Sequence, residues 1–256
     1  MREAMEITLS LVLGLVFLVS AVPAGAADST SNLGPSTSAT PQYTPLGGFR
    51  RAGGVLRQHG RAELLFVGTQ FDSFSAAARW PIVKALDQFG TWSHLAPSSA
   101  NSLIHTVASV GDVPTFDFVH ATYRSRYLTF VHKDTADRNG RTLQHLTARE
   151  NAMYRRYVGK PAYGSAEFTM LAVGGYVMAD SGYPPGDLQD LQGHALTFEA
   201  VQKGLQAGYQ SHYVAYVYEI DAETNVLTAL ICHADGKRPR SVCGQLVIEG
   251  ILKHVK

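Results

Sequence analysis

The stretch LLFVGTQFDSFSAAARWPIVKALDQFG, Leu64–Gly90, contains the pattern that decides the fold. Residues 62–68, AELLFVG, form a largely apolar run ending in glycine, which is typical of a buried central strand. From Phe74 onward, apolar residues recur at three- and four-residue spacing and predict an amphipathic helix that stops at Gly90. Pro81 lies within this stripe, where it removes a backbone hydrogen bond and is expected to kink the helix.

The turn FDSFS, residues 71–75, joins this strand to this helix and offers no residue that is reactive by itself. The side chains of Asp72, Ser73 and Ser75 suit helix N-capping, in which an oxygen accepts backbone N–H groups and contributes about 1 kcal/mol. A negative charge at Asp72 also suits the positive end of the helix dipole. Contact with a ligand, in addition to capping, stays open for these residues.

The rest of the chain continues the alternation of strands and helices. The dipeptide Gly174-Gly175 suits a two-residue hairpin turn between two apolar strands. Trp80 is expected to pack in the core and Arg79 to carry a solvated or locally paired charge. The other predicted elements are extended segments over 115–123 and 126–132, a helix over 143–157, two strands within 169–179, and helices over 196–209 and from 213 to 232. This order predicts an α/β fold of thioredoxin-like layout, with a mixed central sheet flanked by helices and extra C-terminal helices.

The N-terminal segment has the pattern of an export signal. Ile7–Val22 is apolar and without charge, and Ala24 and Ala26 after it fit an A-x-A cleavage site. Residues 1–26 are therefore predicted to be a signal peptide, with an uncleaved membrane anchor as the alternative. Either way, we expect the rest of the protein to act outside the cytoplasm, secreted or anchored through this segment.

Residues 27–48 are rich in Ser, Thr, Pro, Ala and Gly. Such a composition buries too little apolar surface to offset its backbone entropy, so a disordered linker is predicted. The folded domain is then expected over 49–256, a length ordinary for one domain. The formal net charge of +1, with 17% charged residues, gives no electrostatic footprint for nucleic acid, which is not expected as a partner.

Two cysteines occur in the 256 residues, Cys232 and Cys243. In an oxidising compartment an isolated pair predicts a structural disulfide. A zinc site that also used His233 would lack a fourth ligand nearby in sequence. The chain has no G-x-S-x-G, H-E-x-x-H or Walker A pattern, and neither a metal site nor a cofactor is expected.

Residues 67–93, VGTQFDSFSAAARWPIVKALDQFGTWS, resemble the signature of the DUF929 family of thioredoxin-like proteins. That signature has a Cys-x-x-Cys motif followed by Ala-Ala, Arg-Trp and Ala-Leu-x-x-Phe-Gly. ATYRSRYLTF, AVGGYV and NVLTALICHADGKRPRSVC are similar to three further segments of the family, the last with its C-terminal pair of cysteines. The positions shared with the signature are Gly68, Phe74, Ala76, Ala77, Arg79, Trp80, Ala85, Leu86, Phe89 and Gly90, with Tyr123, Ser125 and Tyr127 in the second segment.

The departures from the family pattern bear on function. Where the resemblance places the two motif cysteines, this chain has Asp72 and Ser75, and the position of the usual cis-proline is Thr169. Thiol–disulfide exchange needs a thiolate that attacks a disulfide and a second thiol that resolves it. The resemblance therefore implies a degenerate active site without redox activity at Asp72, Ser75 and Thr169.

We expect a non-catalytic, thioredoxin-like extracytoplasmic protein with a binding or scaffold role. Its partner would be a polypeptide or a small ligand, and membrane contact is expected only if the N-terminal segment is retained. One alternative is a thiol–disulfide oxidoreductase of DUF929 type that uses Cys232 and Cys243; another is a hydrolase or transferase built on Asp72 and Ser75. The candidate ligand groove is formed by Phe71, Asp72, Ser73, Phe74 and Thr169.

Overall fold

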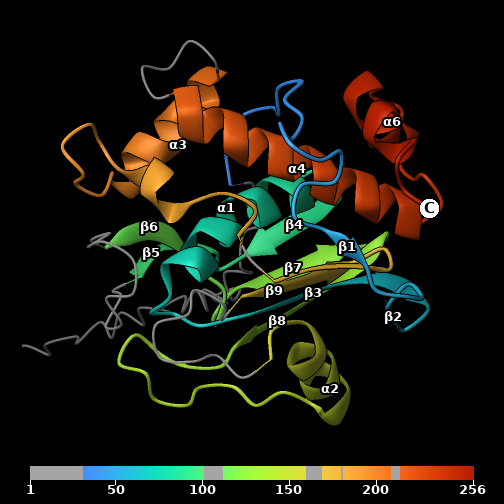
Figure 1. Ribbon diagram of the computed structural model, residues 1–256, viewed down its shortest axis with the longest axis horizontal. Helices are drawn as coiled ribbons and strands as arrows, with labels where there is room; N and C mark the ends of the chain where they lie inside the picture. The colour runs from blue at the N-terminus through green and yellow to red at the C-terminus, as the bar shows by residue number, and fades with distance from the viewer. Residues whose placement is uncertain (1–30, 101–111, 160–168, 180, 209–213) are drawn as a thin grey trace, which may run out of the picture.

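A six-stranded mixed sheet is the centre of the computed structural model, which describes residues 31–100, 112–159, 169–179, 181–208 and 214–256 (Figure 1). Its strands are β1 (Arg50–Arg51), β2 (Arg57–Gln58), β3 (Arg61–Gly68), β8 (Leu128–Asp134), β9 (Met170–Val173) and β10 (Tyr176–Met178). β3 pairs in parallel with β8 and in antiparallel fashion with β2 and β9. β10 then pairs with β9, and β1 with β10, both antiparallel.

β3 is buried on both faces, as its continuous apolar sequence predicts. Successive side chains of a strand point to opposite faces of the sheet. Leu64 and Phe66 join the large core cluster that contains α1 and α4, whereas Leu65 and Val67 join a smaller cluster that contains residues of α2. The sheet therefore has two apolar faces, one packed against α1 and α4 and the other against α2.

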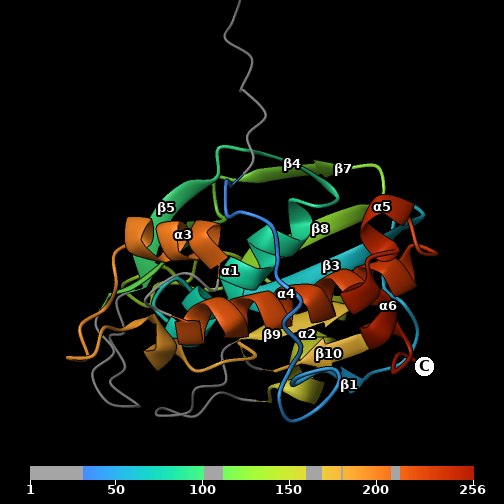
Figure 2. The same ribbon diagram turned by 90° about the horizontal axis from the view of Figure 1, so that it is seen from above.

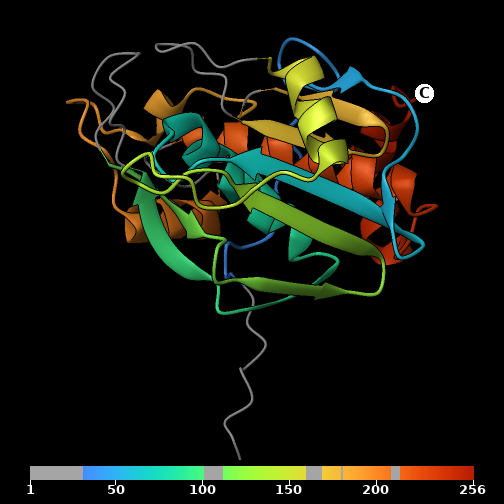
Figure 3. The same cartoon turned by 90° about the horizontal axis from the view of Figure 1, so that it is seen from below.

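Helices lie on both faces of the sheet. The upper face carries α1 (Ser73–Leu86), α3 (Phe198–Ala207) and α4 (Val214–Ala234), with the 3-10 helix η1 (Pro185–Leu188) and the short C-terminal helices α5 (Arg240–Cys243) and α6 (Leu246–Leu252) (Figures 1 and 2). Of the described helices, α2 (Ala148–Tyr157) lies across the lower face (Figure 3). This confirms the predicted α/β class, and the order β8-β3-β9-β10 is compatible with a thioredoxin-like fold. Within the described ranges, no helix has both the length and the apolar character needed to cross a bilayer.

The predicted elements around the turn are present, with shifted ends. α1 ends at Leu86 rather than at Gly90, Pro81 lies within it, and Trp80 is fully buried as predicted. α2 begins five residues later than its periodicity predicts, because Thr147 forms a capping box with Glu150. This capping box ends the extended chain that precedes the helix.

The hairpin turn also follows the prediction. Val173 pairs with Tyr176, so Gly174 and Gly175 are the two turn residues, with φ of 61° and 85°. Positive φ at both positions is what a tight hairpin turn requires and glycine supplies. A Cβ at Gly174 would lie 2.6 Å from the carbonyl oxygen of Leu230, so the turn also packs directly on α4.

Two additional strand pairs lie beside the main sheet and were not predicted in full. β4 (Gly90–Ser93) pairs with β7 (Thr122–Ser125), and β5 (Ala96–Ala100) pairs with β6 (Val113–Asp117). The segments over 115–123 and 126–132 correspond to β6, β7 and β8, but β4 and β5 lack a strand signal of their own. Gly90 is required here, because a Cβ would lie 2.2 Å from the carbonyl oxygen of Arg124.

The chain before β1 differs from the disordered linker predicted over 27–48. Residues 31–48 cross over α4 in Figure 2, and Leu33 is buried. The Asn225 side chain donates to the carbonyl oxygens of Thr37 and Ala39, and Asp221 accepts from the Thr37 N–H. Polar side chains of α4 thus satisfy a backbone that has few apolar residues of its own. Residues 1–30, with the predicted signal peptide, lie outside the described residues.

Candidate functional site

The site begins with the N-terminus of α1, where Asp72 is the N-cap residue. Its backbone is extended, with φ −81° and ψ 127°. The carboxylate accepts hydrogen bonds from the N–H of Ser75 at 2.7 Å and, more weakly, from that of Phe74 at 3.4 Å. N-capping by Asp72, expected from the sequence, is therefore present.

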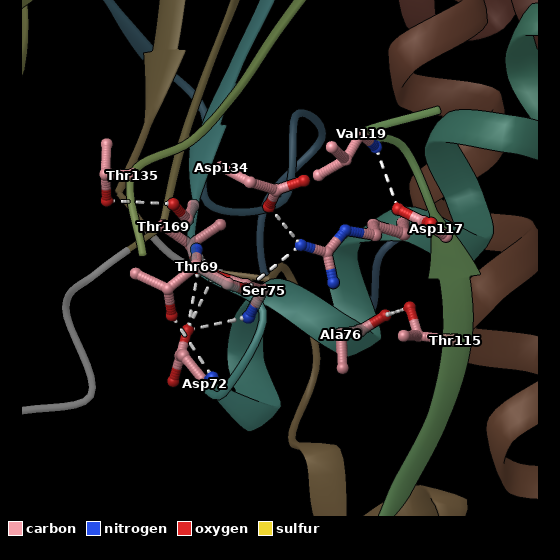
Figure 4. Close-up of polar contacts among 12 residues, drawn as sticks. Thr69, Asp72, Ser75, Ala76, Thr115, Asp117, Val119, Asp134, Thr135 and Thr169 are labelled. Carbon is pink, nitrogen blue, oxygen red and sulfur yellow. Dashed lines mark hydrogen bonds and ion pairs between the residues drawn. The ribbon is translucent and has the colours of Figure 1, made fainter. Parts of the chain in front are cut away.

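Thr169 lies against this cap, because Met170, the residue after it, pairs with Val67 near the end of β3. Its Oγ1 donates to Asp72 Oδ2 at 3.0 Å and lies 2.8 Å from Ser75 Oγ (Figure 4). Ser75 Oγ in turn donates to Asp72 Oδ2 at 2.8 Å. The three positions singled out in the sequence thus form a triangle of oxygen atoms, which we call the Asp72 triangle.

The Asp72 triangle is also hydrogen-bonded to Thr69, the residue just after β3 and before the turn. Thr69 accepts at its hydroxyl from the N–H of Asp72 and donates its own N–H to Ser75 Oγ, both at 3.2 Å. Ser75 and Thr169 are fully buried and Asp72 is 7% exposed. Burial raises the pKa of Asp72 above its ordinary value of 3.8, and the hydrogen bonds from Ser75, Thr169 and Phe74 only partly oppose that rise. The residues of the triangle are bonded to one another and turned inward.

Thr69 is a member of the site that the sequence reasoning missed. The spacing T-x-x-D, from Thr69 to Asp72, resembles the capping pattern in which a hydroxyl bonds a backbone N–H three residues on. That spacing was the available signal.

A buried ion pair lies behind the turn. The Arg79 guanidinium bonds Asp134 at the end of β8 and the carbonyl oxygen of Thr69 at 3.0 Å. It also lies 5.3 Å from the ring centroid of Phe66 and 5.5 Å from that of Phe118. The prediction of a solvated or locally paired Arg79 is wrong, because the chain places a carboxylate 55 residues away beside it. This pair fixes the turn to both β8 and α1.

The side chains of the predicted ligand groove are buried or half-buried. Phe71 is 7% exposed, and Ser73 and Phe74 are half-buried. Two cavities lie elsewhere: one between α2 and the sheet, and one between residues 38–45 and α6. Neither is lined by residues 71–75 or by Thr169. Residues 160–168, which lead into Thr169, lie outside the described residues, so the groove stays a prediction.

Cys232 and Cys243 form a disulfide that joins α4 to α5, with their Cα atoms 5.6 Å apart. Both residues are buried, and the bond leaves no free thiol because the chain has two cysteines. Cys232 follows Leu230 by two residues on α4, and the backbone of Leu230 packs on Gly174 at the tip of the hairpin. Thr169 is at the other end of β9, so the disulfide and the Asp72 triangle lie at opposite ends of the sheet.

The described residues contain no group of three or more His, Cys, Asp or Glu side chains that could hold a metal ion. A zinc site on Cys232 and Cys243 is excluded separately, since both sulfur atoms are joined in the disulfide. His233 between them is exposed.

Comparison with known proteins places the chain in a family but not beside a named relative. No curated protein matches it, and no solved structure does. The family model described as a domain of unknown function, DUF929, matches residues 54–233, which is more than half of the chain. The match includes the turn, Thr169 and Cys232, and stops before Cys243. The chain belongs to the DUF929 family.

Proposed function

We propose that this protein is a redox-inactive, thioredoxin-like binding protein that acts outside the cytoplasm. The observation that carries the proposal is the Asp72 triangle. By the resemblance to the DUF929 signature, Asp72 and Ser75 take the positions of its cysteines, and Thr169, just before β9, bonds with both of them. The strand order β8-β3-β9-β10, with α1 and α4 on one face and α2 on the other, supports the thioredoxin-like part of the proposal.

The chemistry of the triangle favours binding over catalysis. A hydroxyl or carboxylate oxygen cannot form the mixed disulfide on which thiol–disulfide exchange depends. A hydrolytic Ser75 would need a histidine base within hydrogen-bond reach. Its described partners are instead Asp72, Thr169 and the N–H of Thr69, and its side chain is fully buried. The triangle has a structural role: its hydrogen bonds hold the start of α1 to the residue before β9, at the positions where the resemblance places the two cysteines of the family signature.

The alternative oxidoreductase would have to use the disulfide between Cys232 and Cys243. Eleven positions separate these residues in sequence, far more than in Cys-x-x-Cys, and both are buried. A working redox pair has a low-pKa thiol that solvent can reach. The burial of this pair favours a structural role.

Binding is proposed at the turn itself, where Ser73 and Phe74 are half-buried beside the closed triangle. With Phe71, Asp72 and Thr169 they form the candidate groove for a polypeptide or a small ligand. The aromatic ring of Phe74 supplies apolar contact area, and Ser73 supplies a hydroxyl that can donate or accept.

Action outside the cytoplasm is proposed from the export pattern at residues 1–26. Sequencing the N-terminus of the protein isolated from its native host tests it. A start at Ala27 supports cleavage after Ala26, and a start at Met1 or Met5 supports a retained anchor.

Three assays test two parts of the proposal: the lack of redox activity and the binding of a partner at the turn. In an insulin-reduction assay with thiol counting, we expect no turnover above the buffer blank and no free thiol in the denatured, alkylated protein. A fluorophosphonate probe is expected to leave Ser75 unlabelled. Turnover that disappears in a Cys232→Ala, Cys243→Ala variant would instead support the oxidoreductase.

The third assay is cross-linked capture from the native cell envelope. Wild-type protein is compared with Phe74→Glu at the turn and with Leu191→Glu, a matched charge insertion at a residue that is 99% exposed. A partner lost in Phe74→Glu and kept in Leu191→Glu supports binding at the turn. Equal capture by all three proteins would place the binding site elsewhere.

A further inference from the structure

The lower face of the sheet is only partly covered by α2. One cross-strand row runs over five strands on this face, because directly paired residues share a face. From the β1 edge inward, the row is Arg50, Val177, Ala172, Leu65 and Val131. α2 has 10 residues, and its apolar contacts include Leu65 and Val67 on β3. The part of the row that runs toward β1 forms the floor of a cavity.

This cavity has a volume of about 270 Å³ and lies between α2, the hairpin and the chain after β1. Leu56, Ala172 and Val177 supply apolar surface to it. The Tyr157 hydroxyl donates to the carbonyl oxygen of Ala52 at 3.2 Å, which closes the end of the cavity near β1. Pockets that hold drug-sized ligands measure about 300–1,000 Å³, so a cavity of this size has room for one smaller molecule.

α2 presents one face to the cavity, and the residues on this face are regularly spaced. Arg149, Ala152, Met153 and Arg156 follow the i, i+3, i+4, i+7 pattern of a single helix face, and all four line the cavity. The two arginines lie two turns apart, about 10 Å along the axis. An apolar pair is therefore flanked by a guanidinium at each end.

Arg149 has a carboxylate partner, and Arg156 does not have one among the described residues. Arg149 Nη2 contacts both carboxylate oxygens of the buried Glu63, at 2.5 and 2.7 Å, so its charge is neutralised. The guanidinium of Arg156 lies 5.4 Å from the ring centroid of Tyr157. Arg156 is next to Tyr157, which closes the β1 end of the cavity, and Arg50 of β1 shares this sheet face without lining the cavity. Positive charge is therefore in excess at that end.

We propose that this cavity binds an amphiphilic carboxylate, with its head group at Arg156 and its aliphatic chain on the floor of Ala172 and Val177. A planar guanidinium matches a carboxylate in two parallel hydrogen bonds. The apolar floor and Met153 contact the chain, which gains about 0.8 kcal/mol per buried CH₂. The negative end of the α2 dipole opposes an anion here, but by less than one full charge, and Arg50 adds to Arg156 on the other side.

This site is separate from the one in the proposed function. It lies between α2 and the hairpin, and none of the residues that line it belongs to the Asp72 triangle. Turnover in the insulin-reduction assay, or equal capture by wild type and Phe74→Glu, would count against the proposed function and leave octanoate binding at this cavity untouched.

The test uses the protein in solution and octanoate as the probe, with backbone amide chemical shifts as the readout. We expect saturable shifts in residues of α2 and β10, with a dissociation constant of about 1 mM or tighter, given about 10 heavy atoms in the ligand. Butanoate is expected to bind more weakly because its chain covers less of the floor. Octylammonium, which has the same chain and the opposite charge, is expected not to bind.

Two variants locate the head group and the chain. Arg156→Gln is expected to weaken octanoate binding about fivefold, whereas Arg155→Gln on the same helix turn, exposed and outside the cavity, leaves it unchanged. Ala152→Phe fills the cavity from an exposed helix position and is expected to abolish binding without disturbing the core.

Three results would overturn the proposal. The first is the absence of saturable octanoate shifts. The second is equal weakening by Arg156→Gln and Arg155→Gln, which would indicate a general charge effect. The third is octylammonium binding as tight as that of octanoate, which would show that the cavity takes the chain without regard to charge.

Discussion

Thr169 Oγ1 donates a hydrogen bond to Asp72 Oδ2 at 3.0 Å, so the residue before β9 is tied to the N-cap of α1 across 97 positions of sequence. Ser75 Oγ donates to the same carboxylate oxygen and lies 2.8 Å from Thr169 Oγ1. When Asp72 is ionised, both hydroxyl protons point at the carboxylate, and no proton remains between the two hydroxyl oxygens. A protonated Asp72 supplies a third proton, and every side of the triangle then holds one.

Ser75 and Thr169 should contribute to stability as a coupled pair. We expect Ser75→Ala and Thr169→Val each to lower the free energy of unfolding by about 1–2 kcal/mol, because each removes a buried donor to Asp72. The double variant should lose about 1 kcal/mol less than the sum of the two. Urea unfolding followed by tryptophan fluorescence measures this. Thr224→Val, which removes a buried hydroxyl bonded within α4, is the control and should be additive with Ser75→Ala.

Stability should depend on pH through Asp72. Burial raises its native pKa above 3.8, so between the two values the native state binds more protons than the unfolded chain. The stability from this group is therefore full below about pH 4 and is lost as the pH rises through the native pKa. The free energy of unfolding of the wild type, minus that of Asp72→Asn, should fall as the pH rises from about 4.

Asp190→Asn is a control of opposite sign for the same measurement. The backbone N–H of His194 lowers the pKa of Asp190, so the stability from that group is lost as the pH falls. A difference between wild type and Asp72→Asn that is the same at every pH would contradict the assignment.

Restoring cysteines at the turn tests whether its scaffold still favours a thiolate. In the double variant Asp72→Cys, Ser75→Cys, the first thiol should titrate below the ordinary value of about 8.5, because free N–H groups and the helix dipole stabilise the anion. The pair should also close to a disulfide on mild oxidation, since the oxygens of the two native side chains are 2.8 Å apart. The pH dependence of iodoacetamide alkylation measures the titration. Leu191→Cys, at a fully exposed position, supplies an ordinary thiol for comparison.

Loss of the bridge between Cys232 and Cys243 should lower stability and leave the turn intact. The loop of 11 positions corresponds to about 3 kcal/mol on the chain-entropy estimate. A Cys232→Ala, Cys243→Ala variant should therefore unfold at lower urea, while backbone amide shifts of residues 71–75 stay unchanged. Shifts at the turn in this variant would show that the two ends of the sheet are coupled.

The segment before β1 should stabilise the domain. A chain that begins at residue 49 loses the buried Leu33 and the carbonyl partners of Asn225 and Lys84. We expect its free energy of unfolding to be lower by at least about 2 kcal/mol than that of a chain beginning at residue 27. Equal unfolding midpoints would show that these contacts contribute nothing to stability.

Local patterns predicted the elements that local chemistry determines. The apolar run of β3, the helical stripe of α1 and the Gly174-Gly175 turn are properties of neighbouring residues, and all three are present. The Asp72 cap is also local, because its partners lie within three positions. Thr169, placed at the site through the family resemblance, does lie against Asp72 and Ser75.

Distant partners account for what the sequence reasoning missed. Lys84 of α1 is buried against Asp221 on α4, 2.8 Å away, and no neighbour in sequence indicates this partner. β4 becomes a strand because β7 lies beside it, not because GTWS favours extended chain. Residues 31–48 look like a linker by composition, and only the polar side chains of α4 supply the partners that order them.

The course of residues 31–48 also shows on which side of the sheet the described chain begins. Ser31 bonds Asp87 just beyond α1, and Gln202 of α3 donates to the Ser31 carbonyl oxygen, so the chain joins the domain on the α1 and α3 side. The arginine-rimmed cavity opens on the α2 side. Arg50 and Arg156 therefore lie on the face of the sheet opposite to the one that the described chain reaches first.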